Sequence, residues 1–254
     1  KAKAFVTENK DSPFFLYLAF HDIHVPRVPN EQFVGKSTMG PRGDAIAQMD
    51  WCIGQLVKHF EELGLAENTL IIFSSDNGPV LVDGYADKAV ELLGDHHPAG
   101  QFRGAKYSIF EAGTRMSTIA YWPGTVKPGV SDAALSQVDL YASFARLVGQ
   151  EIAQGDAPDS EDHLDAWLGK SNAGRKVLLE EAYTFALREG DWKYIMPQKR
   201  TTPEWMKNKN VESGLLNEPQ LFNLKNDIGE KENVAATNPD VVQIMAKKLE
   251  AILK

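Results

Sequence analysis

The sequence predicts an α/β fold because two strand patterns enclose a helix pattern in its first third. Residues 13–20 form a nearly continuous apolar run, which is typical of a strand buried on both faces. Residues 44–63 place apolar side chains at helical spacing, and Gly64 ends that pattern. A second short apolar run follows at residues 70–74. Strand, helix and strand in this order predict a parallel βαβ unit.

The middle of the chain continues this alternation after a long polar stretch. Residues 79–105 contain many Gly, Asp and His residues, so most of them are expected to form loops. Residues 116–122 predict a third strand, and Pro123-Gly124 closes it. Residues 136–148 have the spacing of an amphipathic helix.

The last third has a different pattern and predicts a separate, smaller unit. Its apolar runs are short and strand-like, and residues 239–253 predict a final helix. We therefore expect residues 1–174 to form a partial sheet flanked by helices. Residues 175–254 are expected to form a small α+β subdomain with antiparallel strands and a terminal helix.

Composition and charge exclude several classes of protein. The chain has 254 residues, of which 43% are hydrophobic and 24% charged, as in ordinary soluble globular proteins. The net charge of −8 and the lack of a Lys/Arg-rich block argue against a nucleic-acid partner. No apolar stretch approaches the roughly 18 residues of a membrane span, so no membrane association is expected.

Ser75-Asp76-Asn77-Gly78 is the most informative segment, because it directly follows a predicted strand. Ligands of open α/β sheets bind beyond the carboxyl ends of the strands. The Asp76 carboxylate and the Asn77 amide provide two oxygen ligands suited to Ca²⁺. The same residues are also common in ordinary turns, and on their own they leave both interpretations open.

Other segments contain residues suited to chemistry. His21 and His24 follow the first predicted strand, and His24 is able to exchange protons near neutral pH. Lys106 lies in a Gly-bearing loop, where its ammonium group suits binding of an oxyanion. The alternative interpretation is that His21, His24 and Lys106 are ordinary surface residues. His97 is a weaker candidate: it either contacts a substrate or is a loop residue without a role in the site.

Taken in order, these segments resemble the sulfatase family of the alkaline-phosphatase superfamily. The matching segments are Phe-Leu-Tyr-Leu-Ala-Phe-His-x-x-His-x-Pro, Ile-Ile-Phe-Ser-Ser-Asp-Asn-Gly and Arg-Gly-Ala-Lys-x-x-x-x-Glu-Ala-Gly-x-Arg. Tyr-Trp-Pro-Gly, Gln-Val-Asp-Leu-Tyr, Gly-Asp-Trp-Lys-Tyr and Leu-Phe-Asn-Leu follow in the expected order. Each segment alone is weak, whereas their order and spacing over nearly the whole chain are specific.

The resemblance implies a role for each matching residue. Asp76 and Asn77 would be ligands of a divalent cation. In this family the cation is usually Ca²⁺, and Mg²⁺ is the alternative. Lys106 would hold a sulfate oxygen, and His24 would act at the leaving-group oxygen. Arg103 and His97 would contact the substrate, which would be a sulfated small molecule or glycan. Loop residues 196–218 are expected to contact a sugar or aryl ring, through Pro197, Trp205 and Met206.

One departure from the family pattern is large. Sulfatases have an N-terminal Cys/Ser-x-Pro/Ala-x-Arg signature whose first residue becomes the formylglycine nucleophile, and this sequence has none. Cys52 lies in a predicted helix with no Pro or Arg behind it, so we interpret it as a buried hydrophobic residue. The resemblance thus implies the C-terminal part of a sulfatase, inactive alone, with the formylglycine in an N-terminal half.

Further expectations follow from this partial match. The chain would expose a sheet edge and apolar surface normally covered by the N-terminal half, which makes a homodimer through that surface possible. By family analogy the protein would be periplasmic or secreted. Two alternatives remain open: a phosphoesterase or phosphonate hydrolase of the same superfamily, and a binder of sulfated glycans without catalysis. Asn77 favours the sulfatase, since two-metal relatives have a zinc-binding histidine at that position.

Overall fold

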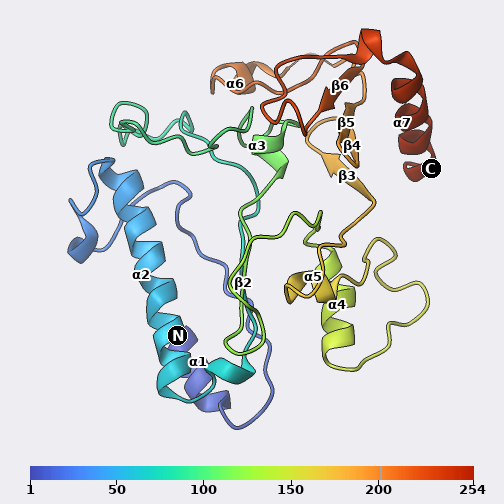
Figure 1. The fold of residues 1–254 in the computed structure, drawn as a ribbon. Coiled ribbons are helices and arrows are strands. Elements are labelled where there is room, and N and C mark those ends of the chain that lie inside the picture. Colours follow the sequence, from blue (N-terminus) through green and yellow to red (C-terminus); the bar gives the residue numbers. More distant parts are fainter. Residues whose placement is uncertain (201) are drawn as a thin grey trace.

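Two groups of elements occupy opposite ends of the molecule, and a short helix lies between them (Figure 1). The computed structural model describes residues 1–200 and 202–254. The first group contains α1 (Ala2–Asn9), α2 (Gly40–Glu62), β1 (Ile71–Phe73), β2 (Ile119–Tyr121), α4 (Asp139–Leu147) and α5 (Leu164–Trp167). Helix α3 (Glu111–Thr114) leads towards the second group.

Helix α2 confirms the helix predicted for residues 44–63 and is the longest helix described. Its first turn is buried, and the buried Asp44 carboxylate accepts hydrogen bonds from the backbone N–H groups of Gly35 (2.8 Å) and Ser37 (2.8 Å). These bonds fix the approach of the chain to the helix. No helix in residues 1–200 or 202–254 combines the length and the apolar character needed to cross a membrane.

The parallel βαβ prediction is wrong for this chain. Strand β1 pairs with β2 in antiparallel register, with Ile72 opposite Ala120. Residues 13–20 lie in no strand, although Phe14 stacks on Phe60 of α2 and Phe15 contacts Phe144 of α4. Successive side chains therefore contact different helices, as in extended backbone. A strand also requires a hydrogen-bonded neighbour, and the described residues provide none for this run.

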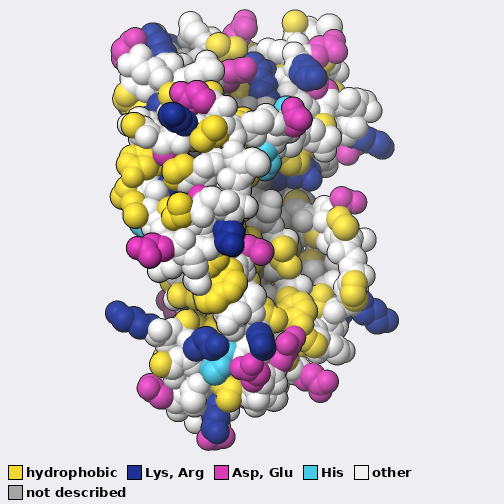
Figure 2. Space-filling view, turned by 90° about the vertical axis from the view of Figure 1, so that its left-hand side faces the viewer, with side chains coloured by type: hydrophobic (Ala, Val, Ile, Leu, Met, Phe, Trp, Pro, Cys, Tyr) yellow, Lys and Arg dark blue, Asp and Glu magenta, His cyan; other side chains and the backbone are white. Residues whose placement is uncertain are grey.

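Exposed apolar side chains accompany this unpaired run. Phe15 is 72% exposed and Tyr17 81%, and in β2 Ile119 is 58% exposed. The prediction of a strand buried on both faces is therefore wrong in the isolated chain. Figure 2 views the side of the molecule on which α2 lies and shows hydrophobic side chains gathered in patches between charged ones. Patches of this kind are typical of surfaces that another polypeptide covers. Self-association through them stays a prediction.

The second group is built on an antiparallel sheet. Its strands β3 (Val177–Glu181), β4 (Phe185–Glu189), β5 (Trp192–Ile195) and β6 (Gln220–Asn223) lie side by side in chain order. Helix α6 (Glu204–Lys207) lies in the β5–β6 connection, and α7 (Pro239–Ile252) ends the fold. The antiparallel strands and terminal helix expected here are confirmed, while the domain division at residue 174 stays a prediction.

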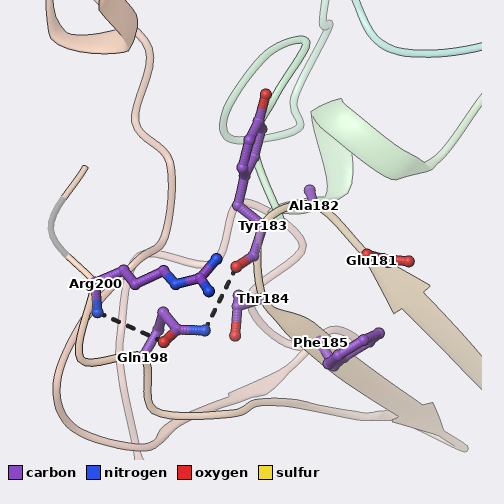
Figure 3. Close-up of a pocket in the computed structure, with 7 residues that line it drawn as sticks. All are labelled: Glu181, Ala182, Tyr183, Thr184, Phe185, Gln198 and Arg200. Atoms are coloured by element: carbon purple, nitrogen blue, oxygen red, sulfur yellow. Dashed lines mark hydrogen bonds between the residues drawn. The ribbon is translucent and has the colours of Figure 1, made fainter. Parts of the chain in front are cut away.

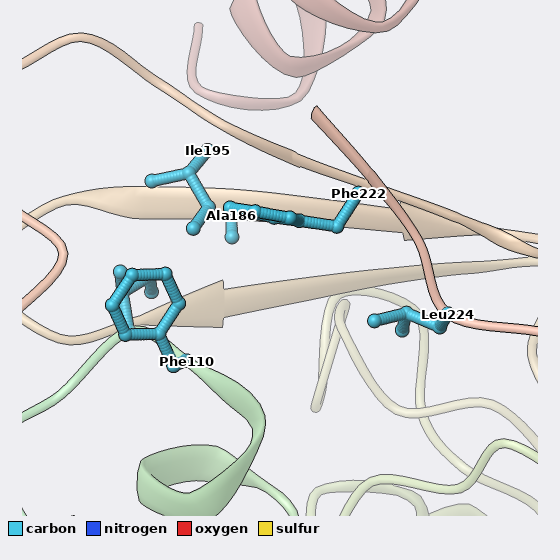
Figure 4. Close-up of a cluster of buried hydrophobic side chains, with 6 residues drawn as sticks. Phe110, Ala186, Ile195, Phe222 and Leu224 are labelled. Atoms are coloured by element: carbon cyan, nitrogen blue, oxygen red, sulfur yellow. The ribbon is translucent and has the colours of Figure 1, made fainter. Parts of the chain in front are cut away.

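Each face of this sheet contributes apolar side chains to a core cluster, because side chains alternate along the strands. Ala186, Ile195 and Phe222 face Ile109 and Phe110, which precede α3 (Figure 4). The residues adjacent to these in each strand face α7 instead; they are Leu187, Tyr194 and Leu221. Phe110 is 2% exposed, and burying such a ring contributes about 2 to 3 kcal/mol. The segment before α3 is thus anchored in the core of the C-terminal sheet.

Candidate active site

The turn after β1 presents the two predicted metal ligands. Asp76 is exposed, and its Oδ1 accepts only a long hydrogen bond from Ser75 Oγ (3.4 Å). Asn77 Nδ2 donates to the Gly78 carbonyl (3.1 Å), so the amide oxygen of Asn77 points away from that bond. Gln137 supports the turn from α4's N-terminal side by donating to the Ser75 carbonyl (2.7 Å).

Gly78 presses this turn against α3. Its N–H donates to the Gly113 carbonyl (3.3 Å), and a Cβ at Gly78 would lie 1.7 Å from the Ala112 carbonyl oxygen. No side chain fits at that distance, so packing against α3 requires glycine at position 78. The position of Asp76 and Asn77 therefore depends on the position of α3.

The Lys106 loop lies directly beside this turn. Lys106 N–H donates to the Pro79 carbonyl (2.8 Å), and Ser108 N–H donates to the Ala105 carbonyl (3.0 Å). Gly104 has φ +90°, where a Cβ would meet Ser108 Oγ at 2.4 Å. Glycine is needed there, because it tolerates both the positive φ and the close contact. The Lys106 side chain is half-buried, with Nζ 5.4 Å from the centre of the Tyr107 ring.

His24 lies in the loop that follows residues 13–20. Its Nδ1 is 2.8 Å from the Val25 carbonyl oxygen, which only accepts hydrogen bonds, so Nδ1 bears the proton. Nε2 is then available to a ligand on the exposed side of the ring. Buried Arg27 fixes this loop by pairing with Asp87 (2.7 Å) and Asp83 (2.5 Å).

Two of the predicted segments are bonded to residues that directly follow the third. Arg27, in the His24 loop, pairs with Asp83 and Asp87, and the Lys106 N–H donates to the Pro79 carbonyl. The His24 loop and the Lys106 loop are thus both bonded to residues 79–87, which directly follow Asp76-Asn77-Gly78. A common site formed by His24, Asp76, Asn77 and Lys106 stays a prediction.

Arg103 and His97 have different surroundings. Arg103 Nε donates to Glu212 (2.5 Å), Nη1 donates to the Glu230 carbonyl (2.6 Å), and the guanidinium lies 4.0 Å from the Phe110 ring centre. These contacts join the Lys106 loop to the C-terminal group. His97 is exposed in a turn closed by Gly100 N–H to its carbonyl (2.9 Å). Substrate contacts of both residues stay predictions.

A buried ion cluster supports α3 and was missed by sequence reasoning. Lys193 Nζ lies 2.9 Å from Glu111, 2.8 Å from Glu180 and 3.5 Å from Glu230, and all four side chains are buried. Glu230 also accepts the Glu111 backbone N–H (2.6 Å). The one sequence signal was a lysine at the centre of an otherwise apolar strand. The cluster fixes α3, and α3 in turn positions the Asp76 turn.

The charged groups of this cluster shift one another's pKa values. Burial alone would lower the pKa of Lys193, but Glu180, Glu111 and Glu230 together hold it well above its usual value. Burial also favours neutral Glu111, yet Lys193, Arg188 and Arg115 lower its pKa overall. Burial raises the pKa of Glu230 to about 7, although Lys193 and the Glu111 N–H favour the charged form. Glu230 therefore holds a proton in acidic solution.

We expect Glu230 to give folding stability a pH dependence near neutrality. Its folded pKa lies above its unfolded value, so the native state binds the extra proton and stability falls as pH rises through about 7. Between pH 6 and pH 8 the loss should be about 1 kcal/mol. Glu230→Gln cannot titrate and should lack this slope. Urea unfolding at both pH values measures it, and equal slopes in the two proteins would contradict the assignment.

The residues present fit one part of a calcium site. Carboxylate and amide oxygens are the donors that Ca²⁺ prefers, but it takes about six to eight of them. The described residues contain no group of three or more His, Cys, Asp or Glu side chains able to hold a metal. Asp76 and Asn77 therefore match the donor chemistry of Ca²⁺ or Mg²⁺ and provide two ligands of a larger set.

Comparison with known proteins shows the family of this chain. The family model described as Sulfatase matches residues 1–150. The N-acetylgalactosamine-6-O-sulfatase of Bacteroides thetaiotaomicron is 46% identical over 99% of this chain and 49% of its own length. The chain therefore belongs to the sulfatase family, and it spans about half the length of the curated relatives it matches.

Solved structures place the chain in the same fold. One comes from work on the metabolism of multiple glycosaminoglycans by Bacteroides thetaiotaomicron; it matches with a TM-score of 0.96, 45% identity, and coverage of 99% of this chain and 52% of that one. A second, Ps i-CgsB in complex with k-i-k-neocarrahexaose, matches with a TM-score of 0.75, 25% identity, and coverage of 98% and 52%. The fold is thus the alkaline-phosphatase-like sulfatase fold, here with mixed helices and antiparallel strands.

Proposed function

We propose that this chain is the C-terminal part of a longer enzyme that hydrolyses sulfate esters on glycans, acting in the periplasm or outside the cell. The observation that supports it best is that the His24 loop and the Lys106 loop are both bonded to residues 79–87, which directly follow Asp76-Asn77-Gly78. The similar N-acetylgalactosamine-6-O-sulfatase makes 6-O-sulfated N-acetylgalactosamine the first substrate to test.

In this proposal each residue acts on one part of the reacting ester. The Lys106 ammonium group neutralises charge that builds on a sulfuryl oxygen as the S–O bond breaks. In its imidazolium form, with a proton on each ring nitrogen, His24 gives its Nε2 proton to the leaving oxygen, which departs as the sugar hydroxyl. Asp76 and Asn77 would hold Ca²⁺, which supplies further stabilisation of negative charge on the sulfate. The nucleophile, a formylglycine by family resemblance, would come from residues outside this chain.

Phosphate ester hydrolysis is the competing activity, and Asn77 argues against it. An amide oxygen suits Ca²⁺ or Mg²⁺, whereas the imidazole of two-metal phosphoesterases suits zinc. We expect the full-length protein with Ca²⁺ to turn over 4-nitrophenyl sulfate at least tenfold faster than 4-nitrophenyl phosphate. A preference for phosphate would overturn the proposed function. Binding of sulfated glycan without sulfate release would instead identify a non-catalytic binder.

A further inference from the structure

An aromatic group beside Lys106 and the pocket next to it form a second feature on this side of the molecule. We propose that Tyr107, Tyr183 and Trp205 bind a neighbouring sugar residue of an oligosaccharide substrate. This proposal rests on the proposed function and names its substrate as a chain of sugars, with one residue at Lys106 and the next on these rings.

The three rings form one contiguous group on the surface. The Tyr107 and Trp205 ring centres are 4.9 Å apart at 86°, and Tyr183 lies 6.1 Å from Trp205 at 59°. Trp205 is 41% exposed and Tyr183 49%. The prediction that Trp205 faces a ligand is compatible with this exposure, whereas Met206 is fully buried and cannot contact one. Stacked sugars pack their C–H groups on such exposed ring faces.

Two of these aromatic residues have unusual backbone conformations. Tyr107 has φ +77° and Tyr183 φ +63°, in a region that bulky residues rarely occupy. Such strain persists only where the surrounding structure imposes it, and it concentrates at functional sites. Here the positive φ values occur in both residues that turn a tyrosine ring towards Trp205. The group is therefore held in place at a cost in backbone energy.

The adjacent pocket offers polar groups suited to a sugar. It has a volume of about 570 Å³, within the range of small-molecule sites, and Tyr183, Gln198 and Arg200 line it. The Gln198 side chain is held loosely: its Nε2 donates to the Tyr183 carbonyl and its Oε1 accepts from the Arg200 N–H, both at 3.5 Å. Figure 3 shows the Arg200 and Glu181 side chains on opposite sides of the pocket. A flat apolar ligand would leave these polar groups unpaired, while sugar hydroxyls satisfy them.

The position of the group fits a chain that continues from Lys106. Tyr107 directly follows Lys106, and Lys106 Nζ lies 5.4 Å from its ring centre. Ser108 Oγ donates to the Glu212 carbonyl (2.6 Å), and Ile109 N–H donates to the Ser213 carbonyl (3.1 Å). These bonds hold the Lys106 loop against the segment after α6. The related structure with a bound neocarrahexaose shows that this fold accommodates linked sugars in a neighbour.

The test compares a sulfated monosaccharide with a sulfated tetrasaccharide of the same terminal residue, using the full-length protein. Trp205→Ala should lower kcat/KM for the tetrasaccharide about tenfold, which corresponds to about 1.4 kcal/mol of lost stacking, and leave the monosaccharide within about twofold. Trp205→Phe should keep most of the wild-type kcat/KM for the tetrasaccharide. Trp51→Ala is the matched control, since Trp51 is 47% exposed on α2, far from α6 in Figure 1. Unchanged melting temperatures verify folding.

Equal losses on both substrates, or no loss on either, would overturn the proposal. If the wild-type protein releases no sulfate from either substrate, the proposed function fails by itself. Calorimetric binding of the desulfated tetrasaccharide then decides the inference separately. Binding weakened about tenfold by Trp205→Ala would support the sugar site. Equal binding by wild type and variant would reject it.

Discussion

Replacing Lys106 by alanine in the full-length protein should lower kcat for a sulfate ester by about a hundredfold or more, as loss of one preorganised charge-stabilising donor does elsewhere. The Lys106 backbone lies beside the turn that presents Asp76 and Asn77, because its N–H donates to the Pro79 carbonyl (2.8 Å). The alanine variant keeps that backbone bond and loses only the ammonium group. Steady-state sulfate release measures the effect.

The control for this experiment is a lysine on the same part of the chain without a site contact. Lys58 of α2 is 65% exposed and faces Glu62 at 3.8 Å, so Lys58→Ala should leave both turnover and stability near wild type. Lys106→Ala should also keep the wild-type melting temperature. Turnover within about threefold of wild type in the Lys106 variant would remove this residue from the proposed mechanism.

The second large effect concerns stability. Lys193→Met should lower the free energy of unfolding by about 3 to 5 kcal/mol, because it leaves three buried carboxylates without their shared cation. Those carboxylates belong to Glu111, Glu180 and Glu230, which lie between α3 and the C-terminal sheet. Urea unfolding of the full-length protein at pH 7 gives the difference.

Lys248 of α7 provides the matched comparison, because it pairs with a residue of the same sheet. It pairs with Glu189 at 2.5 Å, but both side chains are more than a third exposed. Lys248→Met should therefore cost less than about 1 kcal/mol. A loss below about 1 kcal/mol for Lys193→Met as well would mean that the buried cluster does not hold α3 in place.

Local patterns in the sequence predicted those elements whose burial depends on nearby residues. The helical spacing of residues 44–63 gave α2, and the apolar run before Ser75 gave β1. Residues 13–20 were misjudged for a physical reason: a run of apolar residues becomes a strand only beside a hydrogen-bonding partner. In this chain β1 pairs with β2 instead. The apolar pattern of residues 13–20 predicted an extended backbone, but it could not predict whether another strand would pair with it.

The site shows the same division between local and tertiary information. His24, Asp76 and Lys106 were predicted as site residues because each lies in a short recognisable segment. The ion cluster was not, since Glu111, Lys193 and Glu230 meet only when the C-terminal sheet packs on α3. The bonds of Arg103 to Glu212 and to the Glu230 carbonyl were likewise not visible in the sequence, and its substrate contact stays a prediction. A sequence gives the type of side chain, whereas its partners depend on tertiary packing.

The most direct test of the account is a crystal structure of the full-length protein with Ca²⁺ and a non-hydrolysed sulfated sugar. We predict one metal ion bound by the Asp76 carboxylate and the Asn77 amide oxygen. We also predict a sulfate oxygen within hydrogen-bonding distance of Lys106 Nζ, with the leaving-group oxygen next to His24. A metal bound elsewhere, or a sulfate group out of reach of Lys106, would contradict it.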